Sequence, residues 1–191
     1  MIYLLGGSPR TKKTTVAETL VRREAIPFVG TDAIAFVLEH AAPQVGIGLS
    51  MPASQRRVAF FPFLRALIHC QTLTTPRYLI EGEAIAPGDV QLLADEFPVV
   101  ACFVGYDSLS VDELLVKRPS WVEYLDDDAK EALVVQTIER SHELKDECRA
   151  LGLAYVDVSG PHDDAVDRVI DVLLSLEPPS HPRIGSYRRT R

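Results

Sequence analysis

Short, continuously apolar runs alternate along the chain with longer segments of mixed polarity. The runs lack the apolar–polar alternation of a half-exposed strand, which predicts strands that are buried on both faces. The expected strands cover residues 2–5, 26–29, 77–81, 99–104 and 154–158.

The intervening segments carry apolar residues at helical spacing. In the first of them, residues 13–23, one apolar face is formed by Val16, Ala17, Leu20 and Val21. Further helices are expected over residues 33–42, 54–74, 127–150 and 163–176. Pro62 is expected to kink or interrupt the helix that contains it. Strands alternating with helices predict an α/β domain, with a parallel sheet and helices on both of its faces.

The 191 residues suffice for one well-filled core, and we expect a single domain over residues 1–176. Residues 177–191 differ, since they contain three prolines, one glycine and four arginines. This composition predicts a poorly ordered basic tail.

The net charge of -7 argues against a general affinity for nucleic acid or for anionic membranes. No apolar run is long enough to span a bilayer, and no charged leader precedes the first strand. The expectation is a cytoplasmic protein without a nucleic-acid or membrane partner. Nothing in the sequence indicates the oligomeric state.

The strongest chemical signal is the sequence Gly-Ser-Pro-Arg-Thr-Lys-Lys-Thr at positions 7–14. It follows the P-loop pattern G-x-x-x-x-G-K-[ST] between an expected strand and an expected helix. The start of a helix presents free N–H groups and a partial positive charge, which favour phosphate. We therefore expect Lys13 to hold the phosphates of a nucleoside triphosphate and the Thr14 hydroxyl to hold Mg²⁺. The expected nucleotide-binding residues are Gly7, Ser8, Pro9, Arg10, Thr11, Lys12, Lys13, Thr14 and Thr15.

One position departs from the pattern, because Lys12 stands where the motif has its second glycine. Its side chain either crowds the phosphate or points outward and adds positive charge, and the sequence leaves both open. The alternative for the whole motif is an ordinary turn at residues 6–9.

Residues 2–15 resemble the P-loop of the small-molecule and nucleotide kinases. This superfamily includes shikimate kinase, the nucleoside monophosphate kinases, chloramphenicol phosphotransferase and the zeta-toxin kinases. The resemblance in strand–helix order covers residues 1–176. It implies a five-stranded sheet in the order 2-3-1-4-5, an acceptor-side insertion at residues 33–76 and a mobile lid at residues 106–126. It also implies ATP with Mg²⁺ as the phosphoryl donor.

Three carboxylates lie at the ends of expected strands, at the edge of the sheet where ligands bind in open α/β folds. The resemblance implies that Asp32 contacts the acceptor hydroxyl and accepts its proton, and the alternative is a helix N-cap. Glu81 and Glu83 lie two residues apart and are expected to point the same way. Glu81 is then a candidate Mg²⁺ ligand and Glu83 a candidate contact of the acceptor, with Gly82 leaving room for a close ligand. The alternative is a solvated strand end.

The resemblance also implies that Arg118 of the lid and Arg140 of the next helix stabilise the transferring phosphoryl group. Arg140 has the alternative of a surface pair with Glu143. Arg56 and Arg57 are candidates for binding an anionic substrate, with a solvated helix face as the alternative.

Together these features predict an ATP-dependent phosphotransferase that acts on a hydroxyl or phosphate group of a small metabolite or nucleotide. Lys12 motivates an alternative, a non-catalytic or weakly catalytic nucleotide-binding regulatory protein with a degenerate P-loop. A nucleotide hydrolase or a toxin-like kinase of nucleotide sugars is a third possibility. The sequence identifies neither the acceptor nor the preference for ATP or GTP.

Overall fold

The computed structural model describes residues 1–115 and 124–178. Five parallel strands form one sheet in the order β2-β3-β1-β4-β5, which confirms the expected α/β fold and strand order. The strands are β1 (Ile2–Gly7), β2 (Phe28–Gly30), β3 (Tyr78–Glu81), β4 (Val99–Gly105) and β5 (Ala154–Asp157).

The register brings the carboxyl ends of three strands together. Leu5 of the central strand β1 pairs with Glu81 of β3, and Glu81 also pairs with Gly30 of β2. Each of these strands leaves the sheet at the same edge, so the segments that follow them meet there.

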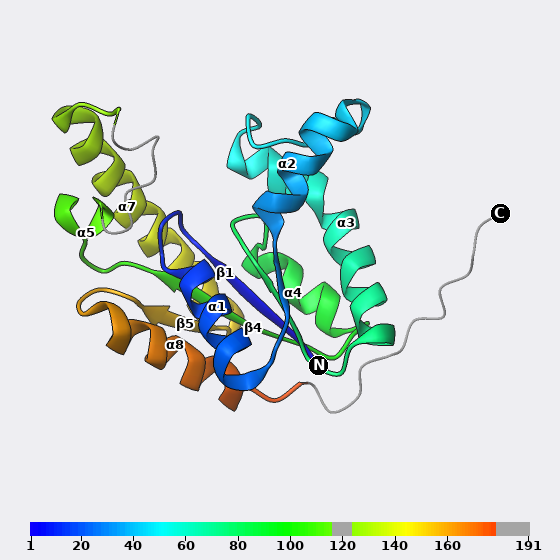
Figure 1. Cartoon of the computed structure of the whole chain (residues 1–191). Coiled ribbons are helices and arrows are strands. Elements are labelled where there is room, and N and C mark those ends of the chain that lie inside the picture. Colours follow the sequence, from blue (N-terminus) through cyan, green and yellow to red (C-terminus); the bar gives the residue numbers. More distant parts are fainter. Residues whose placement is uncertain (116–123, 179–191) are drawn as a thin grey trace.

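Helices cover both faces of the sheet (Figure 1). One face carries α1 (Lys13–Glu24) and α8 (His162–Ser175), and the other carries α3 (Ala53–Thr74), α4 (Pro87–Ala94) and α7 (Asp127–Leu151). Three further elements are α2 (Thr31–Ala41), which directly follows β2, the 3₁₀ helix η1 (Pro43–Val45) and α5 (Val111–Leu115).

The sheet separates two apolar clusters. On the α1 side, Val16 and Leu20 pack with Val169 of α8, and all three are fully buried. On the other side, Phe60 of α3 packs in a cluster with Phe103 of β4. Burial of these continuous apolar runs on both faces is the main stabilising contribution to such a sheet.

Several local expectations differ from the structure. Val21 is 42% exposed rather than part of the apolar face of α1. The helix α3 is not interrupted at Pro62. No helix was expected over α4, although proline is favoured at the first position of a helix and Pro87 occupies that position. Residues 116–123 of the expected lid and residues 179–191 of the expected tail lie outside the described residues.

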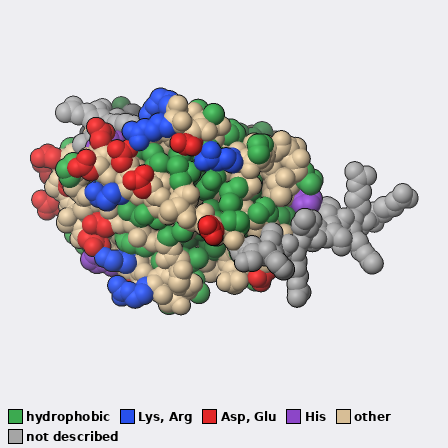
Figure 2. All heavy atoms as spheres, turned by 90° about the horizontal axis from the view of Figure 1, so that it is seen from below, with side chains coloured by type: hydrophobic (Ala, Val, Ile, Leu, Met, Phe, Trp, Pro, Cys, Tyr) green, Lys and Arg blue, Asp and Glu red, His purple; other side chains and the backbone are tan. Residues whose placement is uncertain are grey.

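The surface carries charges of both signs. Acidic and basic side chains are intermingled on the face drawn in Figure 2, with hydrophobic side chains between them. Within residues 1–115 and 124–178, no helix has the length and apolar character needed to cross a membrane.

Candidate functional site

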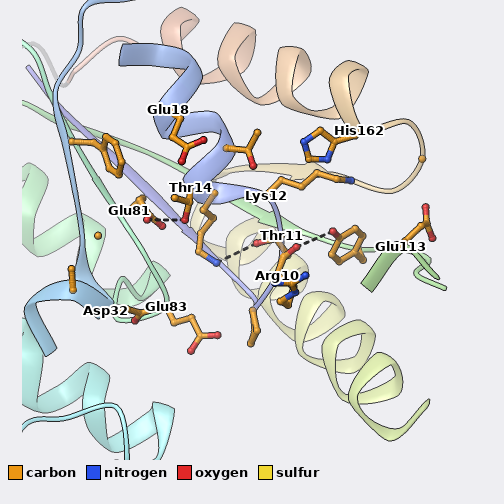
Figure 3. Close-up of a pocket in the computed structure, with 18 of the residues that line it drawn as sticks. Arg10, Thr11, Lys12, Thr14, Glu18, Asp32, Glu81, Glu83, Glu113 and His162 are labelled. Atoms are coloured by element: carbon orange, nitrogen blue, oxygen red, sulfur yellow. Dashed lines mark hydrogen bonds between the residues drawn. The ribbon is translucent and has the colours of Figure 1, made fainter. Parts of the chain in front are cut away.

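A cavity of about 1070 Å³ lies where the strands β1, β2 and β3 end (Figure 3). We call residues 7–14 the P-loop, and it forms the middle of the cavity wall. Residues at the carboxyl ends of β2 and β3 line one end, namely Asp32, Glu81 and Glu83. The opposite end is lined by Tyr106, Glu113, Gly160, Pro161 and His162.

The P-loop has an unusual backbone. Gly7 has a φ of 155°, and a Cβ atom there would lie 2.4 Å from the Val104 carbonyl oxygen, so this position requires glycine. Arg10 and Lys12 both have a φ of 64°, in the left-handed region that favours glycine. Lys12 is the N-cap of α1 and its side chain makes no capping hydrogen bond. The first N–H groups of α1 are therefore without a side-chain cap, as an anion site requires.

Lys13 is 8% exposed, and its ammonium group lies inside the P-loop. Nζ donates to the carbonyl oxygens of Ser8 at 2.7 Å and Gly7 at 3.2 Å, and to Thr11 Oγ1 at 3.3 Å. Burial lowers the pKa of Lys13, while the negative charges of nearby carboxylates raise it. The loop thus holds a desolvated cation on neutral oxygens, and an anionic ligand would be a stronger partner.

Thr14 and Glu81 meet in the cavity. Thr14 Oγ1 donates to Glu81 Oε1 at 3.2 Å, and Glu81 is 7% exposed. Burial raises the pKa of Glu81, and the charge of Lys13 opposes this effect. A hydroxyl and a carboxylate are oxygen ligands of the kind that Mg²⁺ prefers, so this pair fits the expected cation.

Asp32 is exposed and lies in the first turn of α2, on the cavity wall. The helix begins at Thr31 with Gly30 as its N-cap, so the alternative that Asp32 caps α2 is wrong. The expected space at Gly82 is also filled, because a Cβ atom there would lie 1.9 Å from Thr31 Oγ1. The Thr31 side chain, rather than a ligand, takes that room.

Glu83 and the basic residues of α3 form one connected group. Arg56 is 6% exposed, with Nη2 2.9 Å from Glu83 Oε2 and Nη1 3.1 Å from the Leu49 carbonyl oxygen. The alternative of a solvated helix face is therefore wrong for Arg56. Arg57 donates from Nε to the Glu83 carbonyl oxygen at 3.0 Å.

Arg140 of α7 lies near this group. Its Nη1 is 2.8 Å from Glu143 Oε2, the surface pair that the sequence suggested as an alternative. Among the described residues, Arg56, Arg57 and Arg140 are all absent from the cavity lining, and Arg56 and Arg57 contact Glu83, which belongs to it. Arg118 lies outside the described residues.

Three residues at the far end of the cavity, Tyr106, Glu113 and His162, were not among the expected site residues. Tyr106 directly follows β4, and its hydroxyl donates to the Arg10 carbonyl oxygen at 3.0 Å. Glu113 and His162 also line this end. The rule that ligands bind beyond the carboxyl ends of strands would have identified Tyr106, as it did Asp32. Of the nine expected nucleotide-binding residues, the seven at positions 9–15 line the cavity, whereas Gly7 and Ser8 are buried and absent from its described lining.

No protein-family model matches the sequence, and no curated protein matches it. The structure is similar to a gluconokinase from Sinorhizobium meliloti 1021, with a TM-score of 0.56, 16% identity and 90% of each chain covered. It is similar to a shikimate kinase from Bacteroides thetaiotaomicron, with a TM-score of 0.54, 16% identity, and 91% of this chain and 98% of that chain covered. A shikimate kinase from Acinetobacter baumannii in complex with shikimate gives a TM-score of 0.51 at 14% identity, with 91% of this chain and 92% of that chain covered. The sheet order, the loop between β1 and α1 and these similarities show that the chain has the fold of the P-loop kinases.

Proposed function

We propose that the chain is an ATP-dependent phosphotransferase that acts on a hydroxyl or phosphate group of a small metabolite or nucleotide. One observation carries the proposal: a buried cation at a helix start, Lys13, shares a cavity with three carboxylates at the carboxyl ends of β2 and β3. The charges of Asp32, Glu81 and Glu83 all act on the Lys13 ammonium. The similar gluconokinase and shikimate kinases support a small acceptor.

In this proposal the P-loop binds the phosphates of ATP. The free N–H groups at the start of α1 and the Lys13 ammonium orient the phosphates and compensate their charge. Thr14 and Glu81 hold Mg²⁺, which when bound neutralises charge on the phosphate oxygens. Arg118 and Arg140 remain candidates for stabilising the transferring group.

Asp32 serves the acceptor. Its carboxylate is exposed on the cavity wall, at the end that also contains Glu83. A carboxylate at this place orients the acceptor hydroxyl and takes its proton as the acceptor oxygen bonds to the γ-phosphorus and the bond from that phosphorus to the bridging oxygen breaks, releasing ADP.

An acceptor with an anionic group suits the basic residues beside Glu83. The pKa of Arg57 is lowered by burial and also by the positive charge of Arg140, so the two guanidinium groups lie close enough to repel. Arg140 Nη2 is buried and has no hydrogen-bond partner among the described residues. A carboxylate or phosphate of the acceptor would relieve this repulsion and accept from the unpaired donor. Arg56 is already engaged by Glu83, so we assign this role to Arg57 and Arg140 rather than to Arg56.

Calorimetry with Mg-ATP tests the proposal. Wild-type protein should bind in the micromolar range and Lys13→Ala should not, while Lys130→Ala, which removes a lysine of α7 away from the cavity, should bind normally. Production of ADP should then be screened over hydroxylated carboxylates and phosphorylated metabolites. Arg57→Gln should raise the KM of the acceptor and leave that of ATP unchanged, with exposed Arg149→Gln as its control. If no nucleoside triphosphate binds, the proposal is wrong.

The alternative of a regulatory nucleotide-binding protein rests on the left-handed conformation of Lys12. It predicts nucleotide binding that depends on Lys13 but no ADP production with any acceptor. Turnover with one acceptor would exclude it.

A further inference from the structure

The P-loop contains two residues in a conformation that costs them free energy. Arg10 and Lys12 both have a φ of 64°, where a Cβ atom approaches the backbone and glycine alone is comfortable. Such a conformation persists only when surrounding contacts determine it. The contacts of these two side chains therefore bear on how the loop keeps its shape.

Lys12 is anchored at the far end of the cavity. Its Nζ donates to the Val158 carbonyl oxygen at 2.5 Å, and it lies 5.1 Å from the centre of the Tyr106 ring. Figure 3 shows the side chain extending toward the loop that carries His162, while Asp32 and Glu83 lie on the opposite side of the P-loop. The side chain thus points away from Lys13 and from the acceptor end.

The Arg10 side chain is anchored as well, by a different partner. Its Nη2 donates to the Leu114 carbonyl oxygen of α5 at 2.8 Å, and its own carbonyl accepts from the Tyr106 hydroxyl at 3.0 Å. Tyr106 is 3% exposed, so one fixed ring contacts both left-handed residues. The loop backbone is held from β4, α5 and the segment after β5.

We infer that Lys12 is a positioning residue: its bond to Val158 and its contact with Tyr106 hold the left-handed turn that starts α1. Glycine adopts the left-handed conformation at little cost, whereas at Lys12 the contacts of the side chain offset that cost. The inference rests on the proposed function in one respect: the binding of Mg-ATP is used to report the shape of the loop.

Four substitutions at Lys12 separate anchoring from crowding. Lys12→Ala and Lys12→Met keep a Cβ atom in the left-handed region but lose the donor, whereas Lys12→Gly loses the donor and the conformational cost together. Anchoring predicts that Ala and Met weaken Mg-ATP binding roughly tenfold and that Gly binds about as tightly as wild type, since tenfold is about 1.4 kcal/mol. Lys12→Arg, which keeps a charged donor, should also retain affinity.

Amide hydrogen exchange gives a readout that needs no ligand. The Val16 amide donates to the Lys12 carbonyl oxygen at 3.0 Å and reports the first turn of α1. Its exchange should be about tenfold faster in Lys12→Ala than in wild type, and slower again in Lys12→Gly. Tyr106→Leu should accelerate it too, and Lys130→Ala should not.

Two results would overturn the inference. Affinity that rises from Lys to Ala to Gly would mean that the lysine crowds the phosphate. Equal exchange rates of the Val16 amide in wild type, Lys12→Ala and Lys12→Gly would mean that the Lys12 side chain does not stabilise the first turn of α1. Failure of every protein to bind nucleotide would refute the proposed function instead, and the order of Val16 exchange would still decide the role of Lys12.

Discussion

Asp32 stands on the cavity wall in the first turn of α2, and its carboxylate acts on the charge of Lys13. We predict that Asp32→Asn lowers kcat by a factor on the order of 10²–10⁴, because the amide keeps the shape but cannot take a proton. The Kd of Mg-ATP should change little. Steady-state kinetics and calorimetry measure the two quantities, and undiminished turnover would remove Asp32 from the reaction.

Glu81 makes the binding of Mg-ATP sensitive to acid. Burial raises the pKa of Glu81 above its usual 4.5, so as the pH falls the carboxylate gains its proton, and loses its charge, earlier than an exposed glutamate would. Calorimetry between pH 7 and pH 5 should show affinity falling in wild type. Glu81→Gln should bind Mg-ATP more weakly than wild type at pH 7, and its affinity should fall less between pH 7 and pH 5. Some decrease remains in both proteins because the nucleotide itself gains a proton. Parallel pH curves for the two proteins would contradict a role for this carboxylate.

Between elements, the pair of Arg56 and Glu83 joins α3 to the segment after β3. The side chains are 8% and 16% exposed, so removing one partner leaves a desolvated charge. Arg56→Ala should lower the free energy of unfolding by about 3–5 kcal/mol, measured by urea denaturation. The same helix offers a control in Arg65, whose pair with Glu96 is 41% and 33% exposed. Arg65→Ala should cost less than about 1 kcal/mol, and equal losses would refute the distinction.

The helix α3 shows how packing overrides local preference. Pro62 lacks the N–H that an α-helix needs, and its ring clashes with the preceding turn. The helix nevertheless continues, and Phe60, Leu64 and Ile68 form a fully buried stripe along it. Burial of three large side chains outweighs a local penalty of about 3 kcal/mol.

For the molecule as a whole, nucleotide binding should appear as added stability. A ligand that binds only the folded state at 100 times its Kd raises the free energy of unfolding by about 2.7 kcal/mol. We expect this gain from Mg-ATP in urea denaturation of wild type and Lys130→Ala, and its loss in Lys13→Ala. An equal gain in Lys13→Ala would place the nucleotide outside the P-loop.

The features that depend on residues close together in sequence could be predicted without the structure. Continuous apolar runs predicted the five strands. The motif at residues 7–14, between an expected strand and an expected helix, predicted the P-loop. Carboxylates at the ends of strands were expected at the ligand-binding edge, and Asp32, Glu81 and Glu83 all line the cavity. These inferences succeed because strand burial and helix starts follow from local order.

The contact partners of the long side chains depend on the tertiary structure. Arg56 reaches Glu83, 27 positions away, and Lys12 reaches Val158, 146 positions away. Thr31 fills the space beside Gly82 because β2 and β3 are neighbours in the sheet. Periodicity along the chain carries no information about such pairs, since they depend on which elements pack together and in what register.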